Sequence, residues 1–319
     1  MRYKKLGQTG IEVSTLSMGG HEYLPDGRSR GFNENFNMAV TPGYIFEGFG
    51  AEIRKKNLSI AFENGINLFD VTQDSEKEAL GRNLQEITPP YDIFIQTRPE
   101  GMVYTYDRFN RKMAKYELLK AEVQRSLELL KRDHLDFLNI AFMRSALDND
   151  SEYIDKIRYN VNRLKKEGLI RFVCADTFSG EYTYLSQIES NAFDAVYINF
   201  NFADYGAIRK VFPAATEKKL GVISREAFMK GQLFHMADEI GFSDRSKLAQ
   251  IALKWNLSHE PVTTVVVGTN NPEHLKKNLS VFDNLNLTDE ELNIIEAIKR
   301  SKIYQTYKKN KVSGFYRED

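Results

Sequence analysis

The sequence lacks the features of disulfide-linked, zinc-binding, nucleic-acid-binding and membrane proteins. A single cysteine, Cys174, among 319 residues excludes an intramolecular disulfide framework and a zinc-finger pattern. Because 44 basic residues balance 44 acidic ones, the chain lacks the positive field of a nucleic-acid-binding protein. It also has no apolar run approaching the ~18 residues of a membrane span, and no apolar signal-peptide region at its start. These absences predict a soluble, cytoplasmic protein without nucleic-acid or membrane partners.

Two phosphate-binding motifs are missing as well. Neither a G-x-G-x-x-G pattern nor a Walker A pattern occurs in the chain, which argues against a Rossmann nucleotide-binding unit and against a P-loop unit. A chain of this length can bury a core that needs no disulfide or metal to hold it together.

What the chain does contain is an alternation of short β-branched or aromatic runs with longer amphipathic stretches. The runs mix apolar and polar residues without strict alternation, which is typical of strands covered on both sides. Strands are predicted at residues 13–18, 66–70, 91–97, 135–141, 169–175, 195–199, 221–225 and 263–267. Helices are predicted between them at residues 52–64, 115–130, 152–166, 181–190, 205–219, 245–257 and 273–279. Thr288 and Glu291 form a capping-box pattern that predicts a further helix start.

Eight strand–helix units in a chain of this length favour one α/β fold in particular. Strand–helix alternation predicts a parallel sheet, and eight units fit a closed (β/α)8 TIM barrel better than an open, doubly wound sheet, which is the alternative. Residues 1–319 are therefore predicted to form a single barrel domain. The basic residues of 299–317 are expected to belong to a solvated C-terminal helical arm.

Two long connections interrupt the regular spacing. Residues 20–48 are too long and too rich in Gly, Asn and Pro for an ordinary turn, and such loops are often functional lids. Their aromatic residues favour an ordered cover over the C-terminal mouth, where barrel enzymes keep their chemistry. Residues 99–114 form a second extended loop, from which Tyr104 or Tyr106 could reach the mouth. Packing over the mouth without a catalytic role is the alternative for both loops.

Polar residues of both charges are expected to gather at that mouth, because they lie at strand ends or in the first loop positions after them. A metal site is a weaker interpretation, since no H-x-H, H-E-x-x-H or clustered-cysteine spacing supports it, and none is predicted. The expected mouth residues are His21, Glu22, Asp70, Asp74, Arg98, Glu100, Asp176, Arg225 and Glu226.

Six segments, in order, resemble the aldo-keto reductase family across nearly the whole chain. They are residues 1–20 (MRYKKLGQTGIEVSTLSMGG), 63–70 (ENGINLFD), 75–82 (SEKEALGR), 133–138 (DHLDFL), 164–171 (LKKEGLIR) and 262–278 (VTTVVVGTNNPEHLKKN). The resemblance implies the barrel fold and a nicotinamide cofactor, NADP or NAD. It also implies the reduction of a carbonyl by an aspartate, a tyrosine, a lysine and a histidine.

The catalytic set implied by the resemblance is only partly present. Asp70 matches the aspartate, but the turn that should carry the tyrosine is shortened and holds no aromatic residue. Arg98 matches the lysine and Ala141 the histidine. A guanidinium stays protonated and cannot relay a proton as an amine can, although Arg98 could pair with Asp70 or bind an anionic substrate. His21, which follows the Gly19-Gly20 segment, is the candidate replacement acid or base, with a hydrogen-bonded loop histidine as the alternative.

The resemblance also implies a set of cofactor-binding positions. Asp176 and Thr177 match a serine-asparagine pair that holds the nicotinamide amide, Tyr197 matches a glutamine, and Arg225 matches a stacking aromatic residue. Asn270 replaces the basic residue expected for a 2′-phosphate, which weakens the case for NADP against NAD. The remaining cofactor-binding candidates are Gly19, Gly20, Gly268, Glu273, His274 and Asn278.

Three functional hypotheses follow from these residues. The first is an oxidoreductase similar to aldo-keto reductases, which acts on a small polar or anionic carbonyl or alcohol through a remodelled active site. The second is a lyase or isomerase on the same barrel, and the third is a non-catalytic, ligand-sensing family member. Binding of NADH or NADPH would discriminate the first hypothesis from the others.

Overall fold

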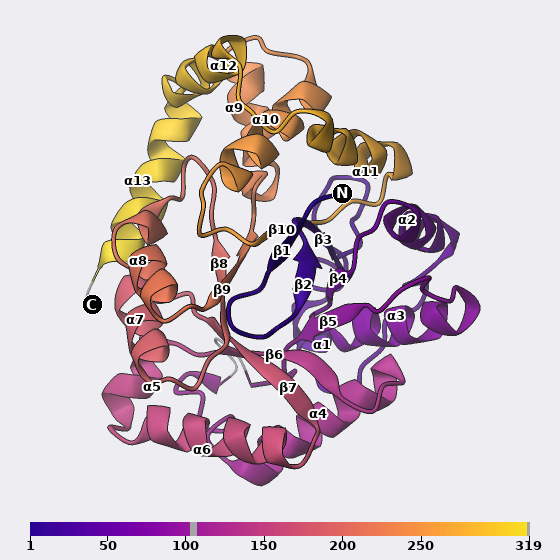
Figure 1. Cartoon of the computed structure of the whole chain (residues 1–319), viewed down its shortest axis with the longest axis vertical. Helices are drawn as coiled ribbons and strands as arrows, with labels where there is room; N and C mark the ends of the chain where they lie inside the picture. Colours follow the sequence, from indigo (N-terminus) through magenta and orange to yellow (C-terminus); the bar gives the residue numbers. More distant parts are fainter. Residues whose placement is uncertain (103–106, 318–319) are drawn as a thin grey trace.

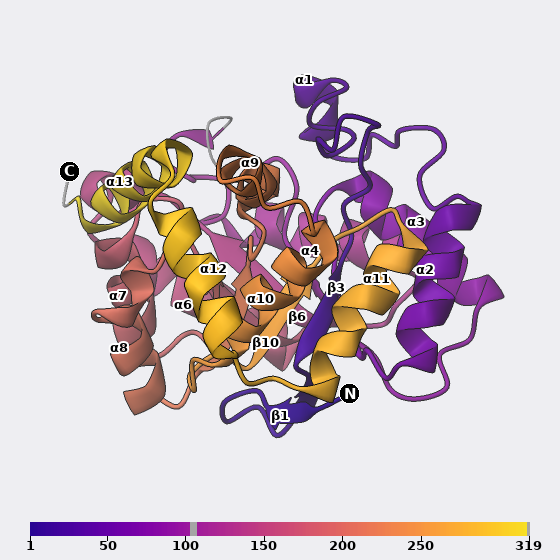
Figure 2. The ribbon, with the colours of Figure 1, turned by 90° about the horizontal axis from the view of Figure 1, so that it is seen from above.

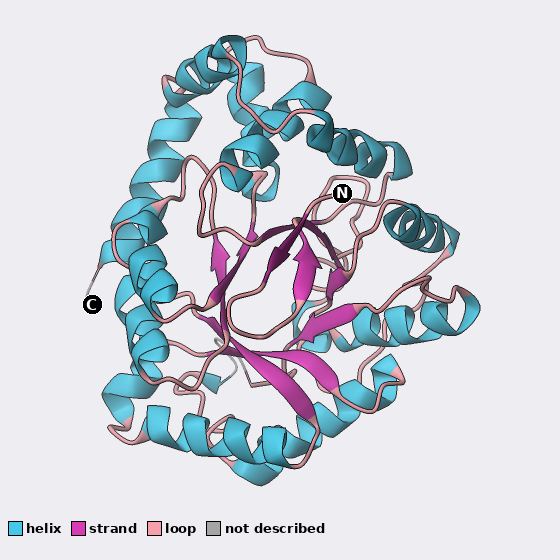
Figure 3. Cartoon of the chain, in the orientation of Figure 1, coloured by secondary structure: helices cyan, strands magenta, loops and turns pink. Residues whose placement is uncertain are grey.

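Eight parallel strands form a closed barrel at the centre of the molecule, surrounded by helices (Figures 1 and 3). The computed structural model describes residues 1–102 and 107–317. Around the barrel the strand order is β10-β3-β4-β5-β6-β7-β8-β9, which confirms the predicted (β/α)8 architecture. The barrel strands are β3 (Leu16–Gly19), β4 (Leu68–Asp70), β5 (Phe94–Thr97), β6 (Leu135–Ala141), β7 (Ile170–Asp176), β8 (Ala195–Asn199), β9 (Gly221–Arg225) and β10 (Thr264–Val267).

The predicted helices are present with one difference, and three further α-helices, Phe36–Ala39, Arg144–Asn149 and Gln232–Glu239, were not predicted. The region predicted as a helix at residues 205–219 is divided into η2 (Gly206–Ile208) and α8 (Val211–Glu217). The capping box is present, since the Thr288 side chain accepts from the Glu291 backbone and Glu291 accepts from the Thr288 backbone. Among the described residues, no helix combines the length and the apolar composition needed to cross a membrane. The other helices are α1 (Phe36–Ala39), α2 (Glu52–Glu63), α3 (Asp74–Glu86), α4 (Tyr116–Leu130), α5 (Arg144–Asn149), α6 (Tyr153–Lys166), α7 (Glu181–Glu189), η3 (Met229–Gly231), α9 (Gln232–Glu239), α10 (Arg245–Leu257), α11 (Pro272–Leu279), η4 (Ser280–Asp283), α12 (Asp289–Lys299) and α13 (Lys302–Tyr316).

The barrel closes where its first strand in the sequence meets its last. Val265 on β10 pairs with Leu16 on β3, and Val267 pairs with Met18, in parallel register. The backbone N–H of Val265 donates to Thr15 O at 3.0 Å, an ordinary length for a hydrogen bond between strands. This seam joins the two ends of the strand series and leaves the barrel without an edge.

A hairpin covers the end of the barrel opposite the mouth. Strands β1 (Tyr3–Lys5) and β2 (Glu12–Ser14) pair in antiparallel fashion, and Leu6 and Val13 are fully buried with Phe137 and Cys174 inside the barrel. Figure 2 shows this hairpin and α1 at opposite ends of the molecule. The barrel is therefore plugged at one end, and its chemistry is confined to the other.

The loop of residues 20–48 forms an ordered cover that is anchored on the start of α3. The Gly43 N–H donates to Asp74 Oδ2 at 2.7 Å, and the Phe46 N–H donates to Ser75 Oγ at 2.9 Å. These bonds fit the predicted lid. In the second extended loop, Tyr104 and Tyr106 lie outside the described residues.

The C-terminal helix α13 forms the predicted helical arm, with its basic residues exposed or partly exposed, and its aromatic side packs against α7, α9 and η2. Tyr304 is 2 % exposed, and the backbone and ring of Phe315 lie against Gly180 and Gly206, where a Cβ atom would clash with them. The basic residues of this segment drew attention to its polar side, whereas its spaced aromatic residues make the contacts.

Candidate active site

A short connection between β4 and α3 shapes the mouth of the barrel. Strand β4 ends at Asp70 and α3 begins at Asp74, so the first turn of α3 lies next to the strand end. Glu76 in that turn is 3 % exposed. Gly20 passes so close that a Cβ atom there would lie 2.8 Å from Asp70 O and 2.9 Å from Glu76 Oε2. The shortened turn that carries no tyrosine therefore delivers a buried carboxylate to the mouth.

That carboxylate holds His21. The Nδ1 atom of His21 lies 2.6 Å from Glu76 Oε1, and Glu76 also accepts from the Thr72 N–H at 2.8 Å and from the Gln73 amide at 3.1 Å. Burial alone would lower the pKa of His21, but the charge and hydrogen bond of Glu76, with the charge of Asp70, raise it above its ordinary value, while Arg98 opposes them. Burial would raise the pKa of Glu76, but the charge and hydrogen bond of His21 and the hydrogen bonds from Thr72 lower it below its ordinary value.

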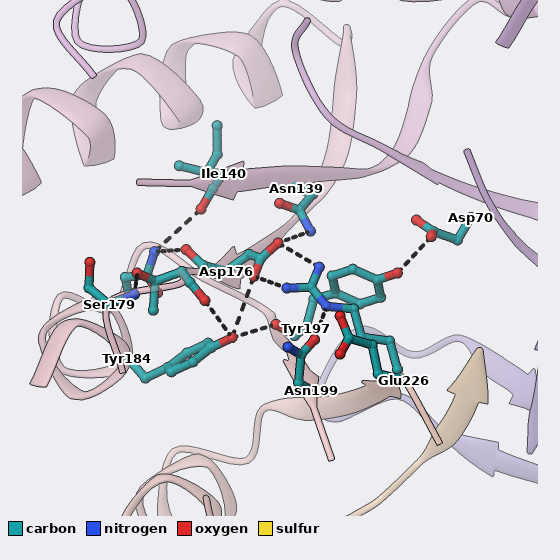
Figure 4. Close-up of polar contacts among 12 residues, drawn as sticks. Asp70, Asn139, Ile140, Asp176, Ser179, Tyr184, Tyr197, Asn199 and Glu226 are labelled. Carbon is teal, nitrogen blue, oxygen red and sulfur yellow. Dashed lines mark hydrogen bonds and ion pairs between the residues drawn. The ribbon is translucent and has the colours of Figure 1, made fainter. Parts of the chain in front are cut away.

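Asp70 lies in a polar layer inside the barrel, at the end of β4. Its Oδ2 accepts from the Tyr197 hydroxyl at 2.6 Å, and its Oδ1 accepts from the Gln96 amide at 3.0 Å. Figure 4 shows Tyr197 extending to Asp70. Burial raises the pKa of Asp70, and the two hydrogen bonds oppose that shift. Tyr197, expected as a cofactor-binding residue, is thus a hydrogen-bond donor to the aspartate.

A second buried pair, Asp176 and Arg225, lies in the same layer. The guanidinium donates to both carboxylate oxygens, at 2.8 and 2.9 Å, and the two side chains are 0 % and 12 % exposed. Asn139 also donates to Asp176, at 3.2 Å (Figure 4), while the Arg225 guanidinium carbon lies 4.4 Å from the Tyr197 ring centroid. Burial raises the pKa of Asp176, and Arg225 opposes it.

Arg98 is a buried cation close enough to the mouth to affect the pKa of two of its residues. It is 7 % exposed, and its charge acts on both His21 and Asp176. Its guanidinium carbon also lies 5.9 Å from the ring centroid of Phe32, a lid residue. The lid therefore lies over the part of the mouth where Arg98, His21 and Asp70 are near one another.

The turn after β10 is in contact with the lid. Asn270 donates to Tyr23 O at 2.6 Å and accepts from the Tyr23 N–H at 3.1 Å. The Tyr23 hydroxyl lies against Gly268, whose missing side chain leaves room for it. The amide of Asn270 is thus occupied by the backbone of the lid.

The other cofactor-binding candidates are divided between this turn and the strand ends. Gly19 O accepts from Arg54 at 2.9 Å, and Thr177 Oγ1 accepts from the Ser179 N–H at 3.0 Å. On α11, Asn278 is buried, whereas His274 and Glu273 are exposed, and Glu273 pairs with Lys276 at 3.0 Å. His274 therefore lies apart from the polar layer.

A comparison with known protein families assigns this barrel. The sequence model of the Aldo/keto reductase family matches residues 47–300, which include seven of the eight barrel strands. The chain belongs to the aldo-keto reductase family. The resemblance to the family is thereby confirmed, and five of its six segments lie within the matched residues.

Individual relatives are distant but cover nearly the whole chain. L-galactose dehydrogenase of Arabidopsis thaliana is 22 % identical over 92 % of this chain and 93 % of its own length. The uncharacterized oxidoreductase YqkF of Bacillus subtilis is 23 % identical over 97 % of this chain and 100 % of its own length. The holo form of the aldo-keto reductase AKR11C1 from Bacillus halodurans superimposes with a TM-score of 0.69 and 18 % identity, over 97 % of this chain and 99 % of that one.

The nicotinamide cofactor implied by the family can be tested against the buried polar atoms of this site. Asp176 already accepts hydrogen bonds from Arg225 and from Asn139, so it is not free to hold a carboxamide. In the same layer, however, Asn139 Oδ1 and Gln96 Oε1 are buried and have no hydrogen-bond partner among the described residues. A carboxamide NH2 group offers two donors. The polar layer therefore fits a nicotinamide amide through a different set of acceptors from the family's serine-asparagine pair.

Metal ligation is a separate question. Throughout residues 1–102 and 107–317, no group of three or more His, Cys, Asp or Glu side chains is arranged to hold a metal ion. His21, Glu22, Asp70 and Asp176 instead have the protein partners described above, with Glu22 accepting from the Gly50 N–H at 2.6 Å.

Three residues of the site were not singled out from the sequence: Glu76, Gln96 and Asn139. Glu76 belongs to a quoted helix-start segment, and the short spacing between Asp70 and that segment was the signal that it lies at the mouth. Gln96 and Asn139 lie within strands that read as mostly apolar, so their inward orientation depends on strand register, which the sequence does not specify.

Proposed function

We propose that this protein is a nicotinamide-dependent oxidoreductase that acts on a small polar or anionic carbonyl or alcohol, with His21 as its proton donor and acceptor. The hydrogen bond between His21 Nδ1 and Glu76 Oε1, at 2.6 Å, is the observation that carries the proposal. Bound nicotinamide supplies or accepts a hydride, and the protein must move the accompanying proton.

His21 suits that role better than the other groups of the mouth. A general acid works best when its pKa lies near the operating pH, and Glu76 raises the pKa of His21 from an ordinary value near 6.5. An ionised partner on one ring nitrogen also fixes the orientation of the imidazole and leaves the other nitrogen for the substrate. By contrast, burial and the charge of Asp70 raise the pKa of Tyr197 well above its ordinary value, so this phenol is a poor proton donor.

The charges of the mouth support a polar or anionic substrate. Arg98 is a buried cation beneath the lid, and a guanidinium binds carboxylates and phosphates through paired hydrogen bonds. The named substrate of the Arabidopsis relative is a sugar, L-galactose, which agrees with a polar compound. Together these observations favour a small hydroxylated or acidic molecule over an apolar one.

We further propose that NADH binds more tightly than NADPH. The position implied to hold a 2′-phosphate is Asn270, whose amide is bonded to the Tyr23 backbone in both directions. An uncharged amide that is already paired contributes less to a phosphate than a free Arg or Lys. The ratio of the two dissociation constants, measured by nicotinamide fluorescence, tests this preference.

The central experiment combines cofactor binding with turnover. Wild-type protein, His21→Gln and the matched control His235→Gln, at an exposed histidine, are titrated with NADH and NADPH and then assayed with small aldehydes, ketones and sugars. His21→Gln is expected to bind the cofactor as wild type does and to lose about 10²–10⁴-fold in rate, the usual contribution of a general acid. His235→Gln is expected to match wild type in both measurements.

Two results would count against the proposal. Absence of cofactor binding at millimolar concentration would favour the lyase or isomerase, or the ligand-sensing hypothesis. Cofactor binding with a turnover rate that His21→Gln leaves unchanged would retain the oxidoreductase and remove His21 from its proposed role.

A further inference from the structure

We propose that a cavity on the flank of the barrel binds a planar aromatic molecule that carries an acidic group. The cavity has a volume of about 370 Å³ and lies between the loop after β8, helix α10 and the start of α13. None of its lining residues belongs to the candidate active site. Its volume falls within the roughly 300–1,000 Å³ typical of small-molecule sites.

The floor of the cavity is aromatic and fixed in place. Phe202 and Tyr304 stack with 6.3 Å between ring centroids and 22° between ring planes, and Trp255 meets Phe202 edge-on at 6.0 Å and 79°. The Tyr304 hydroxyl donates to Phe202 O at 2.9 Å. Phe202 and Tyr304 are 1 % and 2 % exposed. These two buried rings form a rigid base, and a planar ligand ring can pack in stacked or edge-to-face geometry against the partly exposed Trp255 and Tyr205.

The rim of the cavity is positively charged. Lys299 and Lys308 both line it, and the lining residues include no carboxylate. The Lys308 ammonium lies 5.6 Å from the ring centroid of Tyr205, another lining residue, so a cation is positioned over the aromatic wall. Lys299 pairs with Glu296 at 2.7 Å, and both side chains are partly exposed. A ligand with an acidic group would complement this rim, whereas a cationic ligand would be repelled.

The position of Trp255 provides a direct measurement. It is the single tryptophan of the chain, so a change in tryptophan emission reports on this cavity. Benzoate and benzamide, which share size and planarity but differ in charge, serve as probes. Benzoate is expected to change the emission saturably and to bind about three- to fivefold more tightly than benzamide, as an exposed ion pair contributes up to ~1 kcal/mol.

Two lysine variants locate the charge. Lys308→Gln is expected to remove most of the preference for benzoate, while Lys309→Gln, at an exposed neighbour on the same helix, is expected to retain it. His21→Gln should leave benzoate binding unchanged, which separates this cavity from the mouth. Absence of a saturable emission change, equal affinity for the two probes, or an unchanged preference in Lys308→Gln would each overturn the proposal.

Discussion

The hydroxyl of Tyr197 on β8 donates to the carboxylate of Asp70 on β4, with 2.6 Å between the two oxygens. In the barrel order these strands are separated by β5, β6 and β7 on one side and by β9, β10 and β3 on the other. The bond therefore spans the interior of the barrel and places a phenol within the polar layer of the mouth.

Removing that phenol tests its structural role. Tyr197→Phe leaves the buried Asp70 carboxylate without one of its donors, so the free energy of unfolding is expected to fall by roughly 1–3 kcal/mol. Denaturant unfolding measures the change. Tyr159→Phe, at a tyrosine that is 65 % exposed, is the control and is expected to have little effect. Equal stability of the two variants would contradict the prediction.

Removing only one partner of the Asp176–Arg225 ion pair is expected to destabilise the fold strongly. Arg225→Met leaves a buried carboxylate without its cation and should lower the free energy of unfolding by about 3–5 kcal/mol. The double variant Asp176→Asn with Arg225→Met should recover part of that loss, since no unpaired charge remains. Arg245→Met is the control, because Arg245 and Asp238 are 58 % and 50 % exposed and such pairs contribute about 0–1 kcal/mol.

The His21–Glu76 pair predicts a pH dependence of stability with two limits. The pKa of His21 is raised in the folded protein. The contribution of His21 to the free energy of unfolding is therefore complete below pH 6.5, its ordinary pKa, and is lost as the pH rises through the folded-state pKa. The pKa of Glu76 is lowered in the folded protein. The contribution of Glu76 to the free energy of unfolding is therefore present above pH 4.5, its ordinary pKa, and is lost as the pH falls through the folded-state pKa. The stability difference between wild type and Glu76→Gln should therefore be largest between these ordinary values.

Nuclear magnetic resonance titration of the imidazole supplies the matching readout. In Glu76→Gln the pKa of His21 is expected to fall, because the charge and hydrogen bond that raise it are lost. A His21 titration that is identical in both proteins would show that Glu76 does not control this histidine.

The contact between the lid and the turn after β10 predicts a local change in dynamics. Asn270→Ala removes both hydrogen bonds to the Tyr23 backbone, which together contribute roughly 1–3 kcal/mol to keeping the lid in place. Amide hydrogen exchange should accelerate in residues 20–31 and stay unchanged in the barrel strands. Asn293→Ala, at an exposed position on α12, should alter neither.

Most of the fold could be predicted from the sequence because its signals are local. The strand at residues 195–199 and the capping box of Thr288 and Glu291 depend on residues that are close in sequence, and both are present as predicted. The packing of α13 was not predicted, because its aromatic contacts depend on Gly180 and Gly206, which lie more than a hundred residues earlier.

The candidate site was less predictable because its pairs join distant elements. Asp70 and Arg225 were identified at strand ends, but their partners Tyr197 and Asp176 depend on how strands face one another across the barrel. The pairing of His21 with Glu76 depends on the shortened turn after β4. The sequence shows that this turn lacks a tyrosine, but it does not show that Glu76 lies in its place. Family resemblance located the positions, and side-chain contacts redefined what several of them do.

The seam between β3 and β10 has a consequence for how the protein folds. Val265 and Leu16 meet only after most of the chain has been brought into a loop, and the entropy of closing such a loop must be lost before the contact stabilises the barrel. Parallel pairings of this range slow folding relative to local ones. The rate of barrel closure should therefore limit how soon the polar layer is withdrawn from water. A circular permutant that makes β10 and β3 neighbours in sequence should fold faster.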